Sequence, residues 1–113
     1  MDSKRQLQIG ELIKRNFSLI LMKEGMYMYG GAMVSVTNVK MSPDLRLAKI
    51  YLSIFNTEDK ESVMTEIQHH ISLLKQQLVA NIRKQVRFVP DIAIFNDELL
   101  DEMDRVDRLL GEL

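Results

Sequence analysis

The sequence predicts one α+β domain in which a small three-stranded sheet packs on helices. Apolar residues recur at helical spacing in three segments, and they alternate with polar residues in a hairpin-like pair of segments. The elements follow the order αββααβ, with a further helix at the C-terminus. The length of 113 residues, with 46% hydrophobic and 27% charged residues, fits a single globular domain over residues 1–113.

The first predicted helix ends before Gly25. Its apolar residues share one face and its charged residues the opposite face, as in a helix packed on a core. Gly25 is a plausible C-terminal stop, and three glycines between residues 25 and 32 predict a loop. The apolar face consists of Ile9, Ile13, Phe17 and Ile20.

Two strands are predicted next, at Met33–Met41 and Leu47–Phe55. Both alternate between apolar and polar residues, which gives a hairpin with one aliphatic face. Residues 42–45 between them form a turn sequence, in which Pro43 fixes its own φ.

A long helical pattern follows from Glu58 to about Val86, with Thr57 as the expected N-cap. One unbroken helix over this range would be roughly 43 Å long. A compact domain of this size is only about 35 Å across. We therefore expect the helix to bend or split near Ser72, the weakest helix former near its middle.

The chain is predicted to finish with a strand at Arg87–Phe95 and an acidic helix that Asp97 caps. Pro90 suits an edge or bulge position in that strand. The acidic side chains of residues 97–113 are scattered around the helix, which favours a solvated face over a paired-carboxylate site. The expected core contains Ile13, Phe17, Val36, Ile50, Leu52, Ile67, Leu78 and Ile94.

Several classes of function lack their signatures in this sequence. No cysteine is present, which excludes disulfides and thiol chemistry. No phosphate-binding glycine loop or nucleophile elbow occurs. His69 and His70 are adjacent, so on a helix they point about 100° apart and cannot jointly hold a metal. We expect no cofactor, no metal and no catalysis, and we expect a cytoplasmic protein without a membrane span.

The net charge of −1 hides an uneven distribution of charge along the chain. Residues 1–57 carry +4, residues 58–90 carry +1, and residues 91–113 carry −6. A basic body is typical of proteins that bind polyanions, although isolated surface charges remain an equal alternative. Tyr27, Tyr29 and Tyr51 could stack on bases or pack against the protein. The candidate RNA-binding residues are Lys4, Arg15, Arg46, Lys49, Lys75, Arg83, Lys84 and Arg87.

Three segments resemble a known family. They are RQLQIGELI at residues 5–13, VTNVKMSPDLRLAKIYLS at residues 36–53 and RFVPDIAIFND at residues 87–97. All three are similar, in the same order, to segments of the ribosome-binding factor A family. The resemblance covers nearly the whole chain and implies a type II KH-like fold. That family has a small-residue Ala-x-Gly kink between its two later helices, where this sequence has Ser72-Leu73-Leu74.

The resemblance also implies a function. The family assists late maturation of the small (30S) ribosomal subunit by binding the subunit and its 16S ribosomal RNA, including processing of the 5′ end. It implies a monomer that works beside other assembly factors, among them a GTPase. The alternative that the residues leave open is a protein–protein adaptor that uses the hairpin edge and the acidic C-terminal helix.

Overall fold

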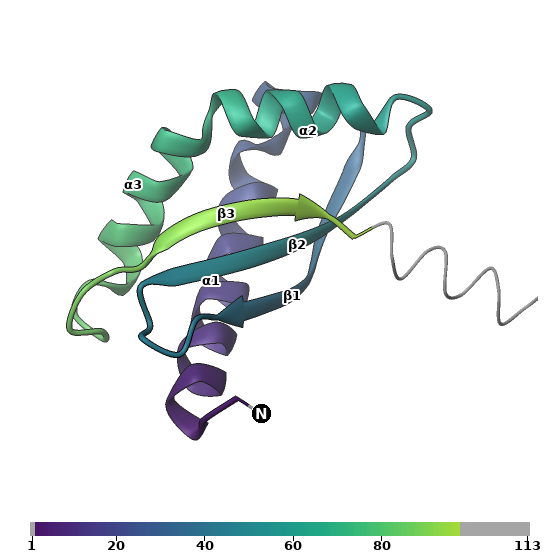
Figure 1. The fold of residues 1–113 in the computed structure, drawn as a ribbon. Helices are drawn as coiled ribbons and strands as arrows, with labels where there is room; N and C mark the ends of the chain where they lie inside the picture. Colours follow the sequence, from purple (N-terminus) through teal and green to yellow (C-terminus); the bar gives the residue numbers. More distant parts are fainter. Residues whose placement is uncertain (1, 98–113) are drawn as a thin grey trace, which may run out of the picture.

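The computed structural model describes residues 2–97, which form three helices and one three-stranded sheet (Figure 1). This confirms the predicted α+β class and the order αββααβ. The predicted helix after Asp97 lies outside the described residues. The elements are α1 (Lys4–Tyr29), β1 (Met33–Met41), β2 (Leu47–Phe55), α2 (Lys60–His69), α3 (Ile71–Ile82) and β3 (Asp91–Asn96).

Helix α1 is longer than predicted. It begins with a capping box in which Ser3 and Gln6 satisfy each other's backbone N–H groups. The helix does not stop at Gly25. That glycine is buried inside the helix, and its missing side chain makes room for the ring of Tyr29 one turn later. The residue that ends the helix is Gly30, whose φ of 66° lies in the left-handed region that favours glycine.

The two hairpin strands begin and end where the alternation predicts, and they pair antiparallel. Strand β3 pairs parallel with β2, so the strand order is β1-β2-β3. The predicted start of the third strand at Arg87 is wrong. Pairing begins only at Asp91, whose N–H donates to the carbonyl of Arg46, because Pro90 just before it has no N–H to donate.

The long helical segment is split, as the length argument requires. The break falls at His70, two residues before Ser72. His70 has φ −103° and ψ 12°, which residues other than glycine adopt readily, so the break needs no small residue. Its backbone N–H donates to the carbonyl of Ile67, and Nδ1 of its ring lies 2.8 Å from the carbonyl oxygen of Glu66.

Two helix ends differ from prediction. Asp59, not Thr57, caps α2, and its carboxylate accepts from the N–H of Ser62 at 3.0 Å. Helix α3 ends at Ile82 rather than Val86. Residues 83–90 then form the turn and loop that lead into β3, so Arg83 and Arg87 are not one helical turn apart.

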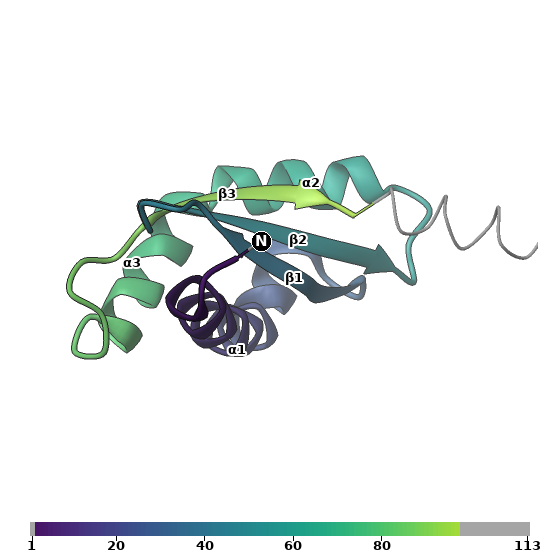
Figure 2. The ribbon, with the colours of Figure 1, turned by 60° about the horizontal axis from the view of Figure 1, so that its bottom comes forward.

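The core lies between the sheet and the helices. Helix α1 passes behind the strands in Figure 1 and below them in Figure 2, and α3 packs beside α1. All eight residues of the predicted core are buried, five of them on α1 and the hairpin. Gly10 lets α1 approach β1 closely, since a Cβ there would lie 3.1 Å from the carbonyl oxygen of Val39. The opposite face of the sheet, toward the viewer in Figure 1, is not covered by α1, α2 or α3.

Candidate nucleic-acid interface

Helices α1 and α3 run antiparallel along a shared seam. Near the middle of the seam, Nε2 of Gln77 donates to Oε1 of Glu24 at 3.1 Å. Towards the N-terminus of α1, Arg5 and Ile9 face the residues just after α3. As residue numbers fall along α1 they therefore rise along α3 and the following loop. We call this line of contact the α1–α3 seam.

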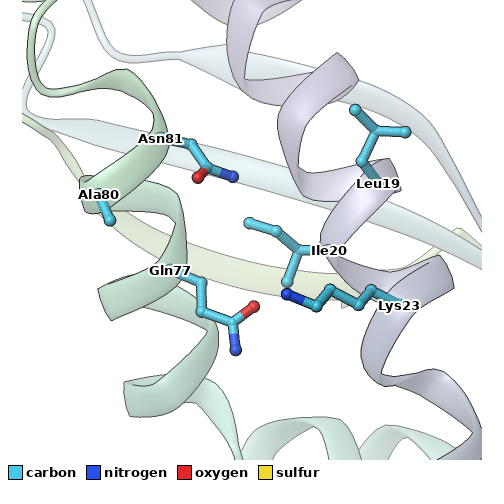
Figure 3. Close-up of a pocket in the computed structure, with 6 residues that line it drawn as sticks. All are labelled: Leu19, Ile20, Lys23, Gln77, Ala80 and Asn81. Atoms are coloured by element: carbon cyan, nitrogen blue, oxygen red, sulfur yellow. The ribbon is translucent and has the colours of Figure 1, made fainter.

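A polar groove of about 290 Å³ lies in the seam (Figure 3). Lys23 extends across it from α1, and the side-chain amides of Gln77 and Asn81 point into it from α3. Ile20 forms its apolar floor, and Leu19 stands at its rim. The Gln77 amide already donates to Glu24, so the groove offers the Lys23 ammonium group and the Asn81 amide, which suit phosphate or sugar oxygens.

Three arginines line two neighbouring hollows at the end of the seam. Arg5 and Arg87 line one hollow of about 350 Å³, and Arg46 lines a second hollow of about 310 Å³. Both hollows share Phe88, whose side chain is 52% exposed. We call Arg5, Arg46 and Arg87, with Phe88 between them, the arginine cluster. Its members come from α1, the hairpin turn and the loop before β3.

The eight predicted binding residues fall into five places. Arg46 and Arg87 belong to the arginine cluster. Arg83 and Lys84 follow the end of α3 and are exposed, between the groove and the cluster along the seam. Lys4 and Arg15 are exposed on α1, on the side away from its buried face. The remaining two are Lys49 and Lys75, and like Lys4 and Arg15 they are not at the seam.

These two residues lie elsewhere. Lys49 is on the face of the sheet that the helices leave open. Lys75 joins α3 to the sheet edge through an ion pair with Asp91, the first residue of β3. This ion pair gives Lys75 a structural role at the edge strand β3. It also engages the Lys75 ammonium group, which would otherwise be available to RNA.

Sequence reasoning missed Arg5 and Lys23. Both lie about 80° from the centre of the apolar face of α1, on the flank where α3 packs. The helical spacing marks that flank, but only the tertiary structure shows that a second helix turns it into the wall of a groove.

Among the tyrosines proposed for stacking, Tyr29 packs against the protein. It is half-buried, and its hydroxyl donates to the carbonyl of Leu21 at 3.3 Å. Burial raises the pKa of this phenol. Tyr27, by contrast, is 88% exposed, so it is accessible to a partner.

A hydrogen-bonded turn positions Arg46. The hydroxyl of Ser42 donates to the carboxylate of Asp44 at 2.7 Å, and the N–H of Arg46 donates to the same oxygen at 3.1 Å. Leu45 takes a positive φ of 63° to complete the turn. These two hydrogen bonds hold the pKa of Asp44 below its ordinary value. The bond from Ser42 has the larger effect and the bond from Arg46 the next.

The titration of Asp44 tests this turn. A carboxyl with a lowered pKa in the folded state stabilises the fold above its unfolded pKa of about 3.9. That contribution is lost as the pH falls through the lower, folded pKa. We expect an NMR titration of the Asp44 carboxyl carbon to show a midpoint below that of aspartate in an unstructured peptide, and we expect Ser42→Ala to raise this midpoint. An identical midpoint in Ser42→Ala would contradict this arrangement of the turn.

The described residues meet the requirements of neither a membrane span nor a shared metal site. Within residues 2–97, no helix combines the length and apolar composition that a membrane span requires. The same part of the chain holds no group of three or more His, Asp or Glu side chains placed to share a metal ion. Exposed cations and amides along a groove favour a polyanionic partner.

Comparison with known proteins gives a consistent result. The sequence profile of the family described as Ribosome-binding factor A matches residues 5–110. A protein named ribosome-binding factor A from Cytophaga hutchinsonii is 39% identical over 113 residues, which cover 100% of this chain and 85% of that protein. One of the same name from Gloeobacter violaceus is 34% identical over 116 residues, covering 100% of this chain and 88% of the relative.

The fold also has a solved counterpart. The crystal structure of ribosome-binding factor A from Thermus thermophilus matches with a TM-score of 0.66 and 15% sequence identity. The match covers 80% of this chain and 94% of that chain. It confirms the fold class expected from the sequence.

Proposed function

Because the chain belongs to the ribosome-binding factor A family, we propose that it binds the small (30S) ribosomal subunit through its 16S ribosomal RNA. In this role it assists late maturation of the subunit and processing of the 5′ end of the RNA, and it does so by binding rather than by catalysis. It works in the cytoplasm as a monomer, beside other assembly factors that include a GTPase.

The arginine cluster is the observation that carries this proposal. Three guanidinium groups from separate elements surround two hollows, and each presents a planar fork that matches phosphate oxygens. Asp91 pairs with Lys75, and Asp44, which lines the hollow of Arg5 and Arg87, is attracted to Arg46. Three arginines beside Asp44 still leave a net positive charge, which can neutralise phosphates and gives affinity without sequence reading.

A second candidate function is protein–protein adaptor. One observation favours it: an apolar hollow of about 400 Å³ lies between the end of α1 and the beginning of the edge strand β1, with Met22, Met26, Met33 and Phe55 among its lining residues. Methionine-rich surfaces adapt to apolar partners. Salt separates the two functions, because phosphate binding weakens steeply as salt rises and apolar docking does not.

Sedimentation of a cell lysate tests the proposed function. The protein, detected by an antibody or a small tag, should travel with free small subunits in a sucrose gradient at low salt. It should shift to the top of the gradient as salt is raised, because its contacts are made to phosphates. Migration with neither subunit at any salt concentration would contradict the proposal, and salt-resistant migration would favour the adaptor.

A further inference from the structure

The face of the sheet that the helices leave open carries a second set of side chains suited to RNA. Residues of this face are exposed on all three strands, since alternate residues of β1 and β2 point away from the core. Its largest side chains are aromatic. Phe95 on β3 is 41% exposed and Phe55 on β2 is 42% exposed.

Two of the aromatic side chains form a pair. Tyr51 lies opposite Phe95 in the parallel register of β2 and β3. Their ring centroids are 5.5 Å apart and their planes differ by 27°, which is a stacked arrangement. The pair holds both rings in fixed positions on a surface that solvent reaches, so a partner that stacks on Phe95 would order few additional side chains.

Two lysines lie beside this pair. Lys49 is two residues before Tyr51 on the same face of β2, a separation of about 7 Å. Lys40 lies directly opposite Lys49 on β1, and both side chains are exposed. Like charges placed opposite each other destabilise a strand pair unless an anion lies between them.

The carboxylates of this region are bound within the protein. Asp97 is only 9% exposed, and the hydroxyl of Thr37 donates to its Oδ2 at 2.6 Å. Asp91, at the edge of the sheet, pairs with Lys75. The exposed face therefore presents fixed aromatic rings next to two cations, which is complementary to the bases and phosphates of an unpaired strand.

We propose that this open sheet face is a binding platform for single-stranded RNA. A base stacks on the Tyr51–Phe95 pair, and Lys40 and Lys49 neutralise the adjoining phosphates. Stacking requires a base whose flat face is free, which double-stranded RNA does not offer. This inference rests on the proposed function and adds the class of RNA: unpaired nucleotides, held on a surface separate from the arginine cluster.

Equilibrium binding of the full chain to two labelled RNAs tests the inference. One is an unstructured uridine-rich oligonucleotide, and the other is a perfect hairpin duplex. The variant Tyr51→Leu/Phe95→Leu, which keeps apolar bulk, should bind the oligonucleotide about tenfold more weakly and the duplex unchanged. Lys49→Gln should weaken binding to the oligonucleotide and reduce its salt slope by about one, and it should leave binding to the duplex unchanged. Leu7→Ala, an exposed apolar change on α1, should alter neither.

A second measurement protects against misfolding of the double variant. In a Tyr27→Phe/Tyr29→Phe chain, Tyr51 is the one remaining tyrosine. Its fluorescence should be quenched by the oligonucleotide and unaffected by the duplex if bases stack beside it.

The outcomes separate the two proposals. Equal affinity of wild type and the leucine double variant for the oligonucleotide, with no change in Tyr51 fluorescence, would overturn the platform while leaving the proposed function intact. The platform would also be overturned if the variant bound RNA normally but lost small subunits, since the face would then contact ribosomal protein. Failure of wild type to bind either RNA or the subunit would contradict the proposed function itself.

Discussion

Replacing Leu52 with alanine should lower the free energy of unfolding by about 2–5 kcal/mol. Leu52 is fully buried on the central strand β2, opposite Val36 on one side and Asn96 on the other. Truncation removes three carbon atoms from the core and leaves a cavity that the surrounding strands and helices cannot close. Urea or guanidinium denaturation, followed by circular dichroism, measures the change.

Leu73→Ala is the matched control for this substitution. Leu73 is on α3 but 43% exposed, so its truncation should change stability by no more than about 0.5 kcal/mol. A loss below that value for Leu52→Ala would mean that this side chain does not face the core, and the register of β2 would then be wrong.

Removal of two charges from the arginine cluster should weaken binding to small subunits by about tenfold for each arginine. The variant is Arg46→Gln/Arg87→Gln, and the physical reason is the loss of two guanidinium–phosphate contacts. The slope of log affinity against log salt should fall by about two, one for each contact. Binding should weaken alike for every RNA sequence, because phosphates carry no sequence information.

Lys14→Gln supplies a control that removes one positive charge away from the cluster. Lys14 is on α1, on the opposite flank from Arg5 and Lys23 and therefore away from the α1–α3 seam. Its replacement should leave the affinity and the salt slope as they are. An unchanged slope in the arginine double variant would move the RNA-binding surface away from the cluster. Tyr27, exposed near the end of α1, would then be the next residue to test.

The parts of the fold that the sequence predicted best are those in which local pattern and packing agree. The alternation in the hairpin gave both strands their observed ends, because one face of each is buried and the other is not. The break between α2 and α3 followed from the length of the segment. Its position at His70 depends on bonds to Glu66 and Ile67 that spacing alone does not reveal.

The errors arose where a residue type has more than one role. Glycine often ends a helix, yet Gly25 lies inside α1, where the absence of a side chain leaves room for the ring of Tyr29. Arg87 was the first residue of the predicted third strand, yet pairing begins only at Asp91, the first residue after Pro90. The periodicity of apolar residues records neither the contact of Gly25 with Tyr29 nor the missing N–H of Pro90, so it could not supply these two boundaries.

The candidate site was predicted in part for a similar reason. Arg46 and Arg87 were identified from charge and spacing, although the helical spacing assumed for Arg83 and Arg87 was wrong. Their proximity to Arg5 depends on how the hairpin turn, the loop before β3 and the start of α1 meet. Lys75 illustrates the opposite case, since a neighbouring carboxylate engages a cation that looked available.

The parallel pairing of β3 with β2 has a consequence for the timing of activity. Arg46 precedes β2 and Arg87 precedes β3, so the two arginines come near each other only after β3 has been made and has added to the sheet. The hairpin and α1 are complete much earlier in synthesis. A chain still emerging from its own ribosome therefore carries the separate cations without the assembled cluster, and binding competence is a property of the finished fold.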